Sequence, residues 1–206
     1  GDRNGSFERL IAHCPGGCST AQASVAAFTS VFAELVRNGF EVLCLVISSK
    51  LSGTYSSASI AAREVDRDKV VVVDSLSTAG GLYLLCKRAW VYAKAGHTLL
   101  QTASMVEALR GRAGIVFSVD DMENLRKSGR LGIVRQSVGT VLNIRPILMC
   151  EEGGIISSGT ARGKYGQVYE LVKRVPATAD VLIVHHLGNP QKAQLIAGEL
   201  RRRFPD

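Results

Sequence analysis

The chain has 206 residues, 46% of them hydrophobic, so it can bury the core of one large domain or two small ones. No apolar run approaches the roughly 20 residues that cross a bilayer, and the start lacks a signal peptide's apolar stretch, so we expect a soluble protein. The net charge of +7 is dispersed and only 6% of residues are aromatic, which argues against a nucleic-acid groove.

Helices and apolar strands alternate through the first half of the chain. Apolar spacings of 3, 3, 1 and 3 predict a helix within residues 21–38. Continuous apolar runs at 40–47 and 69–75 predict two strands that are buried on both faces. This alternation indicates a parallel sheet covered by helices. Further helices are predicted over residues 52–65, 77–96 and 98–114.

The second half predicts a smaller α/β unit. We place the boundary at Ala113–Gly114, which gives domains 1–113 and 114–206. A Glu-Glu-Gly-Gly turn at 151–154 predicts a hairpin. The predicted strands cover 114–119, Pro146–Cys150, Ile155–Ser158 and 180–186, and the predicted helices cover 120–130, 165–175 and 189–204.

The stretch "SSKLSGTYSS" (48–57) places hydroxyl groups directly after the first buried strand. Ligands of parallel sheets bind outside the C-terminal ends of the strands. Ser52, Gly53 and Thr54 at a helix N-terminus offer hydroxyls and free N–H groups, which suit an anion or a carboxylate. Ser52 could equally serve only as the N-cap of the helix, so both interpretations stay open.

A hydrolase and a metal site are the alternatives to a binding site. Ser52, His186 and Asp74 could form a triad, but the chain has no G-x-S-x-G elbow. Five cysteines, an odd number, favour a reducing, cytoplasmic setting. Cys14 and Cys18 lack two further ligands with finger spacing, so we expect no metal and no other cofactor.

Arg130 lies between two glycines in "RKSGRLG" (126–132). An arginine in such a loop is either solvated or an anion clamp, because guanidinium binds carboxylate and phosphate through two hydrogen bonds. The sequence leaves both roles open.

Several motifs together resemble the bacterial DegV family. "SSKLSGTYSSA" (48–58) is similar to the family's S-S-x-L-S-G-T-x-x-S-A, and "LNIRPIL" (142–148) to its L-x-I-K-P-I-L. The matches follow the family's order from about residue 20 to residue 200. The other matching segments are "TAQAS" (20–24), "VVVDS" (71–75), "DDMENLRKSGRLG" (120–132) and "HHLGNPQKAQLI" (185–196).

The resemblance implies two α/β domains and a tunnel between sheet and helices near the domain interface. The tunnel would hold a long-chain fatty acid such as palmitate, stearate or oleate, with the site in the first domain. The protein would present the carboxylate to a separate fatty acid kinase, with transient membrane-surface contact and no catalysis of its own. The family's carboxylate-binding residues fall on Thr20 and Ser52, and its kinase-linked arginine falls on Arg130. Further head-group or partner contacts are expected from Ser49, Gly53, Thr54 and His186.

The chain departs from the family pattern at both ends. The family's N-terminal strand with its T-D-S segment, the strand after it and the C-terminal H-x-G-P-G segment have no counterpart in this sequence. We therefore expect a truncated or divergent member whose sheet lacks one or two strands and exposes an edge. A family member that no longer binds lipid, and a serine-dependent acyl hydrolase, remain the alternative hypotheses.

Overall fold

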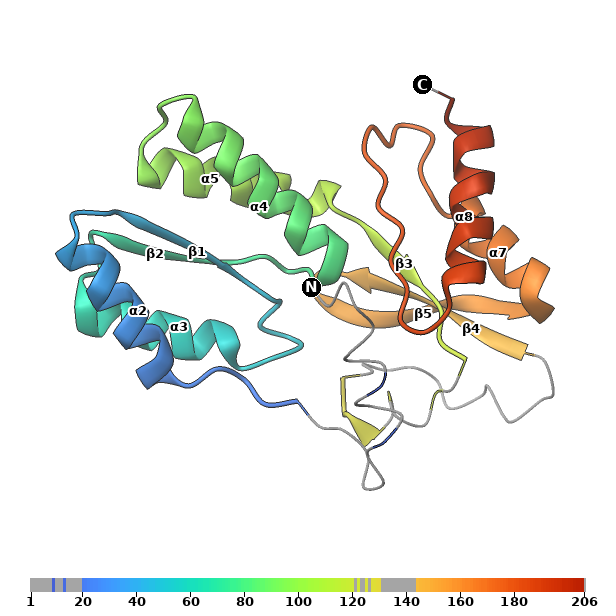
Figure 1. Ribbon diagram of the computed structural model, residues 1–206, viewed down its shortest axis with the longest axis horizontal. Helices are drawn as coiled ribbons and strands as arrows, with labels where there is room; N and C mark the ends of the chain where they lie inside the picture. The colour runs from blue at the N-terminus through green and yellow to red at the C-terminus, as the bar shows by residue number, and fades with distance from the viewer. Residues whose placement is uncertain are drawn as a thin grey trace.

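A computed structural model describes residues 9, 13, 20–120, 122, 125, 127–130 and 144–205. Figure 1 shows helices and strands gathered around two separate sheets, the first of two strands and the second of three. The α/β class and the parallel first sheet are therefore as predicted. The division at 113–114 remains a prediction.

The first sheet pairs β1 (Val42–Val46) with β2 (Val70–Asp74) in parallel, and Val42 lies opposite Val70. Two parallel neighbours need a crossover connection, usually a helix, because the chain has to return to the same end of the sheet. That helix is α3 (Thr54–Val65), which packs beside α2 (Val25–Arg37).

Helices cover both faces of this sheet, with α2 and α3 on one side and α4 and α5 on the other (Figure 1). The helix α4 spans Ala79–Lys94, and α5 spans Leu99–Leu109, followed by a short 3-10 turn at Arg110–Arg112. Two apolar clusters result, one on each face. The first contains Phe32, Val46, Ala58, Ala61, Ala62 and Val70, and the second contains Val73, Leu85, Ala89, Ala103 and Val106.

The second sheet is antiparallel, in the order β3 (Ile115–Phe117), β4 (Ile144–Glu151) and β5 (Gly154–Arg162). The predicted hairpin is confirmed. Its turn places Glu152 at φ 46° and Gly153 at φ 81°. Two successive residues with positive φ match the twist of antiparallel strands.

Neighbouring residues of β4 point to opposite faces of the sheet, as the period of two requires. Ile147 packs with Ala161 and Leu171 beneath the helices α7 (Gly163–Lys173) and α8 (Pro190–Arg203). Leu148 packs instead with Leu51 of the first half of the chain. The strand β4 therefore contributes to two apolar clusters, one around Ile147 and the other around Leu148.

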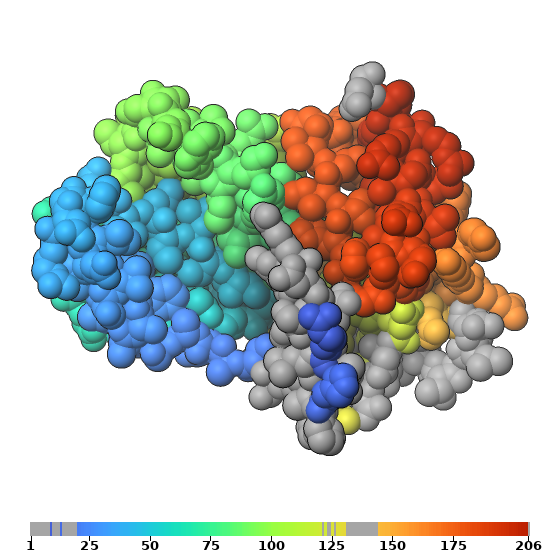
Figure 2. Space-filling model, viewed as in Figure 1, coloured from blue at the N-terminus to red at the C-terminus, as the bar shows by residue number. Residues whose placement is uncertain are grey.

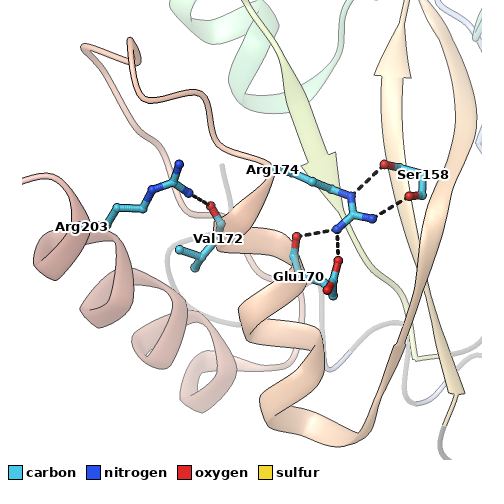
Figure 3. Close-up of polar contacts among 5 residues, drawn as sticks. All are labelled: Ser158, Glu170, Val172, Arg174 and Arg203. Carbon is cyan, nitrogen blue, oxygen red and sulfur yellow. Dashed lines mark hydrogen bonds and ion pairs between the residues drawn. The ribbon is translucent and has the colours of Figure 1, made fainter.

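One arginine attaches α7 to this sheet, and a second attaches α8 to the end of α7 (Figure 3). The Nε of Arg174 donates a hydrogen bond of 2.8 Å to the Ser158 Oγ on β5, and its Nη1 donates to the Glu170 backbone oxygen at 2.8 Å. Arg203 at the end of α8 donates to the Val172 backbone oxygen at the end of α7. Both guanidinium groups thus donate to carbonyls of the last turn of α7, as is common at helix C-termini.

The strand predicted over residues 180–186 is wrong. Residues 181–186 form no strand, and the side chains of Val181, Leu182 and Ile183 are 47%, 37% and 36% exposed. An apolar run indicates where a strand could be buried, but a strand also needs a neighbour for its backbone hydrogen bonds. No strand of the described segments pairs with this one.

Candidate functional site

The segment after β1 is held by both halves of the molecule. Ser48 is fully buried, and its backbone N–H donates to the Ser77 carbonyl at 2.9 Å. Its hydroxyl donates to the Gly153 carbonyl at 2.7 Å, in the turn of the second sheet. Ser48 therefore fixes the loop in place and has no hydrogen left for a ligand.

Ser52, Gly53 and Thr54 form the entrance to α3. The Ser52 and Thr54 hydroxyls lie 2.8 Å apart, and the Thr54 N–H donates to the Ser52 Oγ at 3.3 Å. The N-cap residue is Gly53, which supplies no side-chain cap. Ser24, Thr98 and Asn189 do cap their helices through the side chain. The N-terminus of α3 thus keeps partial positive charge beside two hydroxyl groups.

Gln22 is a residue of this site that the sequence reasoning missed. Its amide packs so closely on Gly53 that a Cβ there would lie 1.8 Å from Oε1. Its Nε2 donates to the Ser57 Oγ at 3.2 Å. Gln22 therefore holds the segment containing Thr20, an exposed residue two positions earlier, against the start of α3. Only its place between the matching Thr20 and Ser24 could have suggested this role.

Arg130 comes to the same loop from the second half of the chain. Its Nε donates to the Leu51 carbonyl at 3.2 Å, and its Nη1 donates to the Ser128 carbonyl. Gly129 precedes it at φ 69°, a conformation that favours glycine. The guanidinium is consequently attached next to Ser52.

Ser49 and Asp74 connect the loops after the two parallel strands. The Asp74 Oδ1 accepts from the Ser49 N–H at 3.1 Å and from the Leu76 N–H at 3.0 Å. In the described part of the chain, no hydrogen bond joins His186 to Ser52 or to Asp74. A Ser–His–Asp triad is therefore not assembled, since the aspartate oxygen serves the backbone.

His185 and His186 differ in their surroundings. The His185 ring lies against Gly80 at the start of α4, where a Cβ would sit 2.5 Å from Nε2. His186 is exposed. The structure thus brings Ser52, Gly53, Thr54 and Arg130 together, and among the described residues no hydrogen bond joins His186 to any of them.

An apolar cluster begins directly beside the polar loop. Leu51, which is 8% exposed, packs with Leu148 and Ile155 of the second sheet. Arg130 bonds to the carbonyl of this same Leu51. A polar group bound at Ser52 would therefore lie at the margin of an apolar region between the two sheets. The partly buried members of the cluster are Ile47, Phe117, Val119, Met122 and Leu125.

The expected tunnel is not visible in the described part of the structure. Two cavities of the described residues lie away from the Ser52 loop. One, of about 370 Å³, is polar, and within it the Lys192 ammonium donates to the Asp120 carboxylate at 2.9 Å. This hydrogen bond lowers the pKa of Asp120. The other, of about 490 Å³, is shallow and is lined by His97, Leu100, Gln101, Ser104 and Met105.

The described residues contain neither a metal-binding cluster nor a membrane span. No group of three His, Cys, Asp or Glu side chains is arranged to hold a metal ion among the residues that the structure describes. No described helix is long and apolar enough to cross a bilayer. Cys14 and Cys18 lie outside the described residues.

Fold and site define an α/β protein with two packed sheets and a hydroxyl-lined loop at the C-terminal end of a parallel strand. Residues 4–206 match the family model described as an uncharacterised protein of the DegV family. The chain belongs to the DegV family.

Three similar proteins illustrate this relationship. A DegV domain-containing protein of Deinococcus radiodurans is 36% identical over 76% of this chain, and the chain spans 56% of that protein's length. A DegV lipid-binding protein of Thermotoga maritima matches with a TM-score of 0.82 and 27% identity, over 95% of this chain and 70% of its own. A DegV family protein of Thermus thermophilus, whose solved structure is described as showing fatty acid binding, matches with a TM-score of 0.70 and 35% identity. The match covers 81% of this chain and 59% of that protein.

Proposed function

We propose that the chain binds one long-chain fatty acid, such as palmitate, stearate or oleate, with its carboxylate at the start of α3. The observation that carries this proposal is the paired Ser52 and Thr54 hydroxyls, 2.8 Å apart, at the N-terminus of a helix whose N-cap residue, Gly53, has no side chain. The lipid-binding and fatty-acid-binding relatives support the same chemistry.

Hydroxyl donors and a helix N-terminus suit a carboxylate that lies next to apolar surface. An unpaired carboxylate in such surroundings would cost several kcal/mol. Ser52 can rotate its hydroxyl towards the ligand, and Thr20 would be the second donor on the segment that Gln22 holds in place. Ser49, Gly53 and Thr54 would complete the head-group site through backbone or hydroxyl contacts.

The acyl chain would run from this loop into the apolar region between the two sheets. Leu51, Leu148 and Ile155 already form its buried part. An aliphatic chain gains about 0.8 kcal/mol for each buried CH₂ group, so this region would supply most of the affinity. The path would leave the carboxylate at the outer end, where a second protein could reach it.

We propose further that the protein is a cytoplasmic binding subunit with no chemistry of its own, and that a fatty acid kinase phosphorylates the presented carboxylate. Arg130 fits a role at the contact with that kinase, because its guanidinium reaches the loop beside Ser52. A positive group there would also stabilise the charge of an acyl phosphate. His186, exposed on the second half of the chain, is a further candidate for contact with the partner.

Ligand identification tests the proposal directly. Mass spectrometry of the denatured protein should release a long-chain fatty acid, and titration with oleate or palmitate should give saturable binding to delipidated protein. A folded protein that neither carries nor takes up a fatty acid would contradict the proposal and favour a family member that no longer binds lipid. Ester hydrolysis that disappears in Ser52→Ala and in His186→Ala would favour the hydrolase instead.

A further inference from the structure

The outer face of α4 carries alternating aromatic and lysine side chains. Tyr83, Lys87, Trp90 and Lys94 follow one another at spacings of 4, 3 and 4 residues. At about 100° per residue, they share an arc of about 60° on the helix surface. We call these four residues the Tyr-Lys-Trp-Lys stripe.

The stripe is exposed, and each aromatic ring lies beside a lysine. The Tyr83 and Trp90 side chains are 53% and 63% exposed. The Lys87 Nζ lies 5.9 Å from the centre of the Tyr83 ring, and the Lys94 Nζ lies 5.9 Å from that of Trp90. Figure 2 shows α4 and α5 (green) as an open part of the molecular surface in this view.

The four residues of the stripe are not part of the core that packs on the first sheet. The buried residues of α4 near its middle, Leu85 and Ala89, lie on the opposite side of the helix and pack on the sheet. An exposed cation–π pair contributes only about 0.5–1 kcal/mol. Folding alone therefore does not account for a tryptophan exposed to this degree.

The charge of α4 selects an anionic partner. The helix contains no aspartate or glutamate. Its third cation, Arg88, lies 4.0 Å from Asp180, so the two lysines of the stripe are its remaining positive charges. A partner that contacts both the aromatic rings and the lysines must combine an apolar region with negative charge.

We propose that the Tyr-Lys-Trp-Lys stripe docks the protein on the surface of an anionic phospholipid bilayer. Tryptophan and tyrosine favour the interface between headgroups and acyl chains, and each lysine near an anionic surface contributes about 1 kcal/mol. The inference rests on the proposed function in one respect: a fatty acid carrier has to exchange its ligand with membranes. The helix would lie in the plane of the interface with the stripe towards the lipid.

Trp90 makes the test direct, because it is the one tryptophan of the chain and its fluorescence reports on this face alone. The delipidated 206-residue chain is mixed with vesicles of phosphatidylglycerol and phosphatidylcholine, or of phosphatidylcholine alone. We expect cosedimentation with the anionic vesicles, a blue shift of the Trp90 emission and loss of both effects at high salt. Neutral vesicles should cause neither.

Charge reversal supplies the matched comparison. Lys87→Glu with Lys94→Glu should weaken vesicle binding at least about tenfold, since each removed cation accounts for about 1 kcal/mol. Arg201→Glu with Arg202→Glu changes the net charge equally on another helix and should preserve the binding. Circular dichroism checks that both variants fold, and oleate affinity in solution should stay unchanged, which separates this proposal from the fatty-acid site.

Four results would overturn the proposal. The first is no cosedimentation with anionic vesicles, and the second is cosedimentation without a shift of the Trp90 emission. The third is equal weakening by the two charge-reversed variants, which would reduce the effect to net charge. The fourth is a Trp90 emission shift of equal size in the absence of vesicles. If it appears as the protein concentration rises, the stripe binds a second copy of the chain. If it appears on addition of a single-stranded DNA oligonucleotide, the stripe binds nucleic acid.

Discussion

The hydroxyl of Ser48 donates a hydrogen bond of 2.7 Å to the carbonyl oxygen of Gly153, 105 residues further along the chain. Ser48 follows β1, and Gly153 lies in the turn between β4 and β5. A Cβ on Gly153 would lie 2.4 Å from the Ser48 Oγ, and the residue has φ 81°. This contact fixes the loop that carries Ser52 against the second sheet.

Replacing Gly153 should therefore destabilise the protein through two effects. In Gly153→Ala, the positive φ strains the alanine and the added methyl group displaces the Ser48 side chain. We expect a loss of about 2–4 kcal/mol in the free energy of unfolding, measured in urea. Gly39→Ala is the control, because Gly39 has φ 82° but nothing within 4 Å of a Cβ, so it should show the strain alone. Equal losses in the two variants would contradict the close contact.

Ser52→Ala should weaken fatty-acid binding without unfolding the protein. A hydrogen bond to a charged group contributes about 1.5–3 kcal/mol, so the dissociation constant for oleate should rise about tenfold or more in calorimetry. Ser56→Ala, an exposed serine two positions into α3, is the control and should bind like the wild type. An unchanged dissociation constant in Ser52→Ala would remove this serine from the carboxylate site.

Arg130→Ala should preserve fatty-acid binding and lower acyl-phosphate formation in the presence of a fatty acid kinase. We expect a roughly tenfold or greater fall in that rate, because a charged contact with the partner and the product is lost. Arg201→Ala removes an exposed arginine from α8 and should leave both measurements unchanged. A parallel loss of binding and turnover in Arg130→Ala would place the guanidinium inside the fatty-acid site.

Arg174→Ala should loosen α7 from β5. The guanidinium donates to the Ser158 Oγ at 2.8 Å and to the Ser158 carbonyl at 2.6 Å, and the side chain is 19% exposed (Figure 3). Because these partners are left without a donor, the free energy of unfolding measured in urea should fall by about 1–3 kcal/mol. Arg202→Ala breaks an exposed pair with Glu199, 2.8 Å apart, and should cost less than about 1 kcal/mol. Similar costs would mean that Arg174 does not attach the helix.

Cys44 should make stability depend on alkaline pH. Burial, and to a smaller extent the nearby Cys86, together raise the pKa of this thiol from 9.0 to about 11. The thiol ionises more easily in the unfolded chain than in the folded protein. Its contribution to the free energy of unfolding is therefore complete below about pH 9 and declines as the pH rises towards 11.

The check is a series of thermal melts between neutral and strongly alkaline pH. Cys44→Ala should show a flatter decline of the melting temperature in the alkaline range than the wild type does. The comparison uses slopes, because the substitution also removes packing and lowers the melting temperature at every pH. Identical slopes would show that the Cys44 thiol is not protected from ionisation.

The sequence by itself determined the local elements of the first sheet. Apolar runs at 40–47 and 69–75 predicted the strands that the structure places at Val42–Val46 and Val70–Asp74. Such runs are reliable here because a strand covered on both faces needs apolar side chains throughout. The hairpin turn at Glu152 and Gly153 was equally local, since its conformation depends on the residues of the turn itself.

Only the tertiary structure decided which distant groups meet. Residues 181–186 have the apolar pattern of a strand but no hydrogen-bonding neighbour among the described strands, and pattern carries no information about a neighbour. Gln22 against Gly53 and Ser48 against Gly153 are likewise contacts between segments far apart in the chain. The sequence could place hydroxyls at the start of a helix, but packing of the two sheets determined that Arg130 and the apolar cluster around Leu51 lie beside them.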